Sequence, residues 1–166
     1  DLALYDDLRT CLAENFEVDL DQATVFGFSG GALFTTVVLT QRSDTLAAAV
    51  EMSGGADVEM ATYENDFSAY ETPAVPLPVL LADGGSTDVW PDSSFTLLDF
   101  QEATDTLQSR LLADGHFVVR CSHSSGHTIT WPIYEVAIEW LTSHSYREAS
   151  PFEGGIGDWA SWCEIA

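Results

Sequence analysis

The chain has 166 residues, of which 46% are apolar and 11% aromatic. This is enough for one domain with its own hydrophobic core, and the composition is that of a globular protein. It carries 27 acidic residues against five arginines and no lysine, which gives a formal net charge of −22. Such a surface repels the phosphates of nucleic acids and of anionic membranes, so we expect neither as a partner.

Apolar periodicity predicts helices over residues 2–16, 32–40, 95–113 and 133–141, and buried strands over residues 24–28, 46–52, 78–82 and 116–121. Because strands and helices alternate along the chain, we expect an α/β fold with about four parallel strands and flanking helices. Residues 57–76 are polar and irregular, which is typical of a surface excursion. The expected domain spans 1–144, and a Gly-rich aromatic tail, 145–166, is expected to lie over it.

The segment Gly27-Phe28-Ser29-Gly30-Gly31 joins the first predicted strand to the second predicted helix. It is a Gly-x-Ser-x-Gly pattern, and between a strand and a helix this pattern is typical of a strained turn that exposes a nucleophilic serine. The backbone N–H of Gly30 would lie at a helix N-terminus, where it can stabilise a developing oxyanion. Taken alone, the pattern also fits an ordinary Gly-rich turn.

A serine hydroxyl needs a base to take its proton, and the base needs an acid to orient it. In parallel sheets such residues gather in the loops after the carboxyl ends of strands. Asp88 follows the third predicted strand and His127 follows the fourth. The order Ser29, Asp88, His127 is the nucleophile–acid–histidine order of α/β-hydrolases, so we predict these three residues as the catalytic triad.

The acid and the base each have a rival in the sequence. Asp83 ends its strand directly, and His123 lies four residues nearer to its strand than His127 does. We expect the other two histidines, His116 at the start of a strand and His144 at the end of a helix, to be structural.

Several motifs match one known group of enzymes. They are Asp6-Asp7-Leu8, Val18-Asp19, the serine turn through Ala32, Val50–Gly54, Pro78–Leu81 with Gly84–Asp88, and Gly126-His127. Over about residues 3–142 the sequence resembles the polyhydroxyalkanoate depolymerase and feruloyl esterase group of α/β-hydrolases. This resemblance implies a secreted serine ester hydrolase that acts on aryl esters, acetylated or feruloylated polysaccharide, or a polyester, without cofactor or metal. One departure is Ala82-Asp83-Gly84, where the group usually has a His-Gly pair.

Three aromatic residues are candidates for the substrate site. Trp90 lies just after the predicted acid, Trp131 lies just after the predicted base, and Phe28 precedes the serine. The two tryptophans would form an aromatic wall for an acyl or aryl group, and a simple packing role is equally compatible with the sequence.

The chain contains three cysteines, Cys11, Cys121 and Cys163, none of which has metal-site spacing. An odd number leaves one thiol unpaired within the chain. We expect an exported protein with one internal bridge, and the alternative is three unbridged thiols.

Members of the resembling group carry further strands before this point, including a loop that supplies a second oxyanion N–H. The strand before Ser29 would therefore lie at an exposed sheet edge, which invites pairing. We expect a companion N-terminal chain or segment to cover it. Cys11 is the candidate bridge to that companion, which would leave Cys121 to pair with Cys163.

Two other functions remain open on the sequence. One is a serine peptidase on the same scaffold. The other is a non-catalytic binding or surface-assembly module, which the missing oxyanion loop and the extreme acidity would suit.

Overall fold

The computed structural model describes residues 2–58, 68–91 and 96–166. The helices are α1 (Leu2–Asn15), α2 (Gly30–Gln41), α3 (Phe100–Ala113) and α4 (Trp131–Thr142). The strands are β1 (Thr24–Phe28), β2 (Ala48–Met52), β3 (Val79–Asp83), β4 (Val89–Trp90), β5 (Leu98–Asp99), β6 (Val118–Ser122) and β7 (Cys163–Ile165). Part of the expected surface excursion, including Tyr63 and Phe67, lies outside the described residues. So does Phe95, the expected first residue of the third predicted helix.

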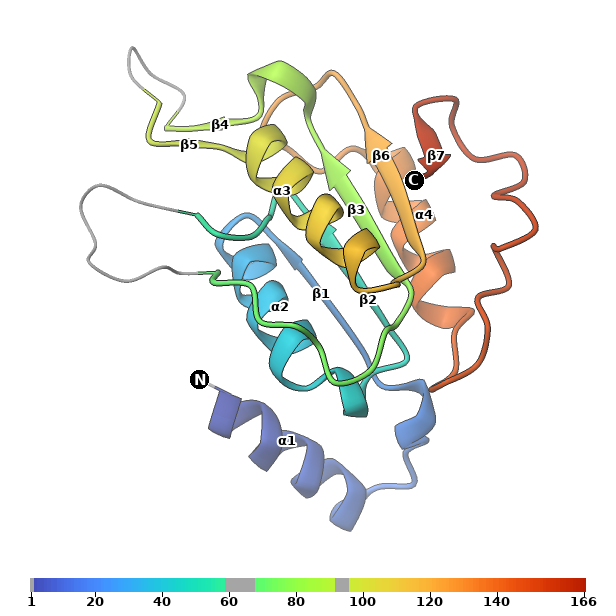
Figure 1. Cartoon of the computed structure of the whole chain (residues 1–166). Coiled ribbons are helices and arrows are strands. Elements are labelled where there is room, and N and C mark those ends of the chain that lie inside the picture. The colour runs from blue at the N-terminus through green and yellow to red at the C-terminus, as the bar shows by residue number, and fades with distance from the viewer. Residues whose placement is uncertain (1, 59–67, 92–95) are drawn as a thin grey trace.

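The strands form a sheet of order β1-β2-β3-β6-β7, in which the first four are parallel and β7 is antiparallel to β6. Helices α2 and α3 cover one face of this sheet and α4 covers the other (Figure 1). The chain therefore has the expected α/β architecture, and the carboxyl ends of β1, β2, β3 and β6 meet along one edge.

Each face of the sheet has its own hydrophobic core, because alternate residues of a strand point to opposite faces. Val50 and Leu80 belong to the cluster that contains α4, whereas Ala49 and Leu81 belong to the cluster that contains α2 and α3. All five residues of β2 and of β3 are buried. This explains why β3 is apolar up to its last residue, Asp83, and why β2 is apolar apart from Glu51.

The structure differs from the expectation in three places. The tail supplies β7, a fifth strand of the sheet. The sequence does not predict it, because the segment has only three residues of mixed polarity. A short antiparallel pair, β4 with β5, precedes α3, and α3 begins only at Phe100, where the Asp99 carboxylate caps it by accepting from Glu102 N–H at 3.1 Å. Helix α4 begins at Trp131, two residues earlier than expected, because Pro132 suits the first helical turn.

One side of the molecule exposes many apolar side chains. Among the described residues, β1 pairs only with β2, and α1 contains no buried residue. The exposed apolar side chains include Leu4 (57%), Leu8 (54%), Phe16 (63%) and Phe26 (58%). A mainly apolar groove of about 250 Å³ runs between α1 and the segment leading into β1. No helix in the described part of the chain is long and apolar enough to cross a membrane.

Candidate active site

Ser29 lies at the turn between β1 and α2, with a strained backbone conformation (φ 56°, ψ −125°). A β-carbon at Gly27 would collide with the backbone of Gly31, so this turn requires glycine there. The Ser29 N–H donates to the carbonyl of Met52 at 3.0 Å, which fastens the turn to the end of β2. The pattern read from the sequence thus forms the strained serine turn that it predicts.

The three residues predicted as the triad lie in one chain of hydrogen bonds. The Ser29 Oγ lies 2.9 Å from His127 Nε2, and His127 Nδ1 lies 2.7 Å from Asp88 Oδ1. Asp88 is fully buried, whereas the His127 side chain is 21% exposed. A buried carboxylate in this position holds the imidazole in the tautomer that can accept the serine proton.

Gly30 is the first residue of α2. Its backbone N–H belongs to the first helical turn, where no carbonyl of the same helix can accept from it. It is therefore available to an oxyanion beside Ser29, as the sequence predicts for this position.

The rival acid, Asp83, has a different set of partners. Its Oδ2 accepts from Arg120 Nε at 2.7 Å, and its Oδ1 accepts from Ser122 Oγ at 2.9 Å and from Gly85 N–H at 2.8 Å. Asp83 and Arg120 are both buried, so they form a buried ion pair between β3 and β6. Asp83 supports the turn that carries Asp88 and makes no hydrogen bond to a histidine side chain.

The remaining histidines have partners away from the serine. His123 Nδ1 accepts from Ser125 N–H at 3.3 Å. His116 is hydrogen-bonded to the backbone of Leu77, and His144 joins Trp140 O to Ser150 Oγ. Burial lowers the pKa of His116 and of His144, because a buried site disfavours the charged imidazolium. Of the four histidines, His127 alone is hydrogen-bonded to the serine.

The His127 ring is stacked against two phenylalanines. Its centroid lies 4.8 Å from that of Phe28 and 4.4 Å from that of Phe100. Phe28, a candidate for substrate binding, therefore packs against the base. Phe100 was missed in the sequence, where it reads as an ordinary apolar position of α3, and only the folded chain brings it beside His127.

A cavity of about 400 Å³ opens beside the histidine. It is lined by Thr87, Val89, Trp90, Ser125, Gly126 and His127. Trp90 is 45% exposed and forms part of its wall. Trp131 is 70% exposed on the first turn of α4, where its ring contacts Tyr134, and it does not line this cavity. The structure thus places one of the two candidate tryptophans beside the base.

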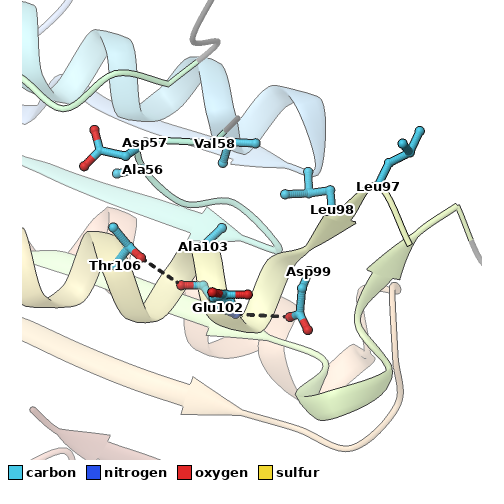
Figure 2. Close-up of a pocket in the computed structure, with 9 residues that line it drawn as sticks. All are labelled: Ala56, Asp57, Val58, Leu97, Leu98, Asp99, Glu102, Ala103 and Thr106. Carbon is cyan, nitrogen blue, oxygen red and sulfur yellow. Dashed lines mark hydrogen bonds between the residues drawn. The ribbon is translucent and has the colours of Figure 1, made fainter. Parts of the chain in front are cut away.

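A second cavity, of about 230 Å³, lies between the start of α3 and the segment after β2 (Figure 2). Its wall contains three carboxylates, and none of Ser29, Asp88 and His127 lines it. Asp99 caps α3 and Asp57 is paired with Arg110 at 2.9 Å, so these acids have structural partners. No group of His, Cys, Asp and Glu among the described residues is arranged to hold a metal ion.

The structure joins Cys121 to Cys163 in a disulfide that links β6 to β7, and Cys11 is an exposed free thiol on α1. The bridge pins the tail to the sheet. One internal bridge with one thiol left over is the arrangement that the sequence favours.

Comparison with solved structures identifies the fold as that of the α/β-hydrolases. The native structures of pOPH and sOPH superpose with TM-scores of 0.78 and 0.75, at 20% and 16% sequence identity. A carboxylesterase of Bacillus cereus superposes over 84% of this chain with a TM-score of 0.59 at 20% identity. No protein-family model and no curated protein matches the sequence.

The chain spans only part of these structures. It is covered over 99% of its length by pOPH and 98% by sOPH, but it spans 59% and 58% of those chains and 57% of the carboxylesterase. It therefore shares its fold with a part of each of these structures.

Proposed function

We propose that this chain carries the catalytic residues of a serine carboxylic-ester hydrolase that works through an acyl-enzyme. The observation that supports this most directly is the continuous chain of hydrogen bonds from Ser29 through His127 to Asp88. A polar chain of this kind, buried at the acid and open at the serine, is the arrangement that activates a hydroxyl.

In the proposed reaction, Ser29 Oγ forms a bond to the ester carbonyl carbon while its proton passes to His127 Nε2. The carbonyl oxygen becomes an oxyanion, to which Gly30 N–H donates. The intermediate collapses, the bond to the alcohol breaks, and the alcohol leaves with the proton from His127. Water then attacks the acyl carbon while one of its protons passes to His127 Nε2. The bond from the acyl carbon to Ser29 Oγ breaks, His127 returns the proton to Ser29 Oγ, and the carboxylic acid leaves. Asp88 stays ionised and holds the imidazole in place.

The substrate class is an ester with an aryl or polymeric component, such as an aryl ester, a feruloylated or acetylated polysaccharide, or a polyester. The cavity beside His127 has Trp90 in its wall, and an aromatic ring offers a broad apolar surface to such groups. The names of similar structures, a carboxylesterase and a thermostable esterase, favour esters over peptides. Parallel assays on p-nitrophenyl esters and on peptide substrates would separate an esterase from a serine peptidase.

We also propose that the protein is secreted. The disulfide between Cys121 and Cys163 supports an oxidising compartment. An excess of 22 negative charges suits salt-rich surroundings, which screen self-repulsion. Detecting the protein in culture medium with the disulfide intact would test this proposal.

The apolar surface of α1 and β1 supports a companion polypeptide as part of the active protein. Unpaired edge strands with exposed apolar side chains are rarely left uncovered. The companion would add a strand to β1 and supply the second oxyanion donor, and Cys11 is the candidate point for a disulfide to it. Finding Cys11 free in the active protein, by mass spectrometry under non-reducing conditions, would remove that bridge from the proposal.

The experiment that tests the function is intact mass with a fluorophosphonate probe, which reacts only with an activated serine. We expect one adduct, mapped to Ser29, and none in Ser29→Ala. Ester turnover should fall by more than about a hundredfold in that variant. If the active protein, with any companion, binds polymer but ignores the probe, it is a binding module and the catalytic proposal fails.

A further inference from the structure

Ser53 is a buried serine whose hydroxyl donates to the acid of the triad. It follows β2 directly and is 2% exposed. Its Oγ lies 2.8 Å from Asp88 Oδ2. Its backbone has a positive φ of 49°, a conformation that serine adopts only at some cost. A buried polar residue held in a strained conformation at a sheet edge calls for an explanation beyond packing.

The backbone around Ser53 joins the two halves of the site. Its N–H donates to the carbonyl of Ala82 at 2.8 Å, next to the turn that carries the acid. The preceding carbonyl, of Met52, accepts from Ser29 N–H at 3.0 Å. One short segment therefore fastens the nucleophile on one side and contacts the acid turn on the other.

The hydrogen bonds of Asp88 divide between its two oxygens. Oδ1 faces His127, whereas Oδ2 accepts from Ser53 Oγ and from Gly84 N–H, the latter at 2.7 Å. Two donors on Oδ2 prevent the carboxylate from rotating, because rotation would leave both of them unpaired in a buried site. They also offset part of its negative charge.

We propose that Ser53 is a positioning residue of the triad, which orients Asp88 toward His127 and limits how strongly the carboxylate attracts the protonated imidazole. This inference rests on the proposed function. Two other ionisable groups near the strand ends have partners of their own: Asp83 is paired with Arg120, and Glu51, whose pKa is raised by burial, accepts from Thr36 Oγ1 and Gly55 N–H. Ser53 and Gly84 thus provide the donors that face Oδ2.

The test compares Ser53→Ala with Ser53→Gly. Both lose the hydroxyl, but glycine also removes the backbone strain at positive φ. We expect kcat/KM to fall by about 10- to 150-fold in both, the range for losing a hydrogen bond to a charged group. We also expect the acid limb of the pH profile to move to higher pH, because a less stabilised carboxylate holds the imidazolium longer.

Ser122→Ala is the matched control. It removes another hydroxyl at the same sheet edge that donates to a carboxylate, but that carboxylate is Asp83, outside the triad. Its acid limb should stay in place.

NMR titration of the His127 ring measures the pH at which the imidazole becomes protonated and needs no turnover. It therefore tests this inference separately from the proposed function. A midpoint for His127 that moves upward in both Ser53 variants, and not in Ser122→Ala, supports the inference even if the esterase proposal fails. A midpoint that stays or moves downward in either folded Ser53 variant overturns it. A wild-type protein that the fluorophosphonate probe does not label would instead contradict the proposed esterase function.

Discussion

Gly84 and Gly126 are in direct backbone contact. The N–H of Gly126 donates to the carbonyl of Gly84 at 3.0 Å, and a β-carbon on Gly84 would overlap the carbonyl of Gly126. Gly84 precedes the turn that carries Asp88, and Gly126 precedes His127. The distance between acid and base is therefore set by two loops that approach as closely as their backbones allow.

Gly84→Ala should separate these loops. We expect a loss of about 1–3 kcal/mol in the free energy of unfolding, as for other overpacked sites. Turnover should fall by about tenfold or more, because small displacements of catalytic groups are costly. Urea unfolding and ester kinetics measure the two effects. Gly154→Ala is the control, since nothing lies within 4 Å of a β-carbon there, and an equal effect in both variants would contradict the prediction.

Asp83→Asn and Asp88→Asn should separate the two carboxylates that follow β3. Asp88→Asn is expected to lower kcat by about a thousandfold or more, because an amide cannot hold the required imidazole tautomer. Asp83→Asn should destabilise the fold by about 1.5–3 kcal/mol, since it removes one of the two carboxylates paired with the buried Arg120 and leaves Asp105 as its counter-ion, yet keep turnover per folded molecule within about tenfold. Kinetics on protein quantified by circular dichroism would distinguish them. The reverse pattern would make Asp83 the acid.

The disulfide should contribute substantially to stability. Cys121 and Cys163 are separated by 42 residues, and the chain-entropy relation gives about 4 kcal/mol for closing such a loop. We therefore expect Cys163→Ser to lower the free energy of unfolding by about that amount, measured in urea without reductant. Cys11→Ser removes an exposed free thiol and should leave the free energy of unfolding of this chain by itself unchanged. Equal stability of both variants would show that the tail is held without the bridge.

Glu51 should make stability fall as the pH rises. It is fully buried in β2, where Thr36 Oγ1 and Gly55 N–H are its hydrogen-bond partners, and burial raises its pKa well above the ordinary value of 4.5. The unfolded chain releases this proton above pH 4.5 while the folded chain keeps it. The associated stability is therefore complete below that pH and is lost as the pH rises toward the folded pKa.

Glu51→Gln removes this titration and keeps a similar shape. The stability of the variant relative to wild type should increase with pH by about 1.4 kcal/mol per pH unit above 4.5, until the native carboxyl itself ionises. Urea unfolding from pH 4 to 8 measures this difference. Glu135→Gln, on the exposed side of α4, should show no such slope. A flat difference for Glu51→Gln would mean that the carboxyl is ionised in the folded protein.

Much of the fold follows from local patterns in the sequence. The apolar runs that predict strands at 24–28 and 78–82 correspond to β1 and β3 within one residue at each end. For β3 the reason is that a strand buried on both faces needs nearly every residue to be apolar, whereas β1 is apolar but only partly buried among the described residues. The tail strand β7 was missed, since Glu164 and Ile165 are exposed and only pairing with β6 makes the segment a strand. The predicted start of α3 lies too early. Residues just before this helix belong to the β4–β5 pair, which forms through contacts between two separate segments and leaves no local pattern in the sequence.

The sequence by itself determined the serine turn and most of the strand segments, because each depends on residues within a few positions of one another. The chain order of Ser29, Asp88 and His127 is read from the sequence directly. The sequence left two alternatives for the acid, Asp83 and Asp88, and two for the base, His123 and His127. Only the tertiary structure shows how their contacts differ, since it pairs Asp83 with Arg120 and brings the His127 ring between Ser29 and Asp88. Phe100 and Ser53 were likewise found only there. The physical reason is that hydrogen bonds and ring contacts between loops depend on how neighbouring strands align, which distant residues decide together.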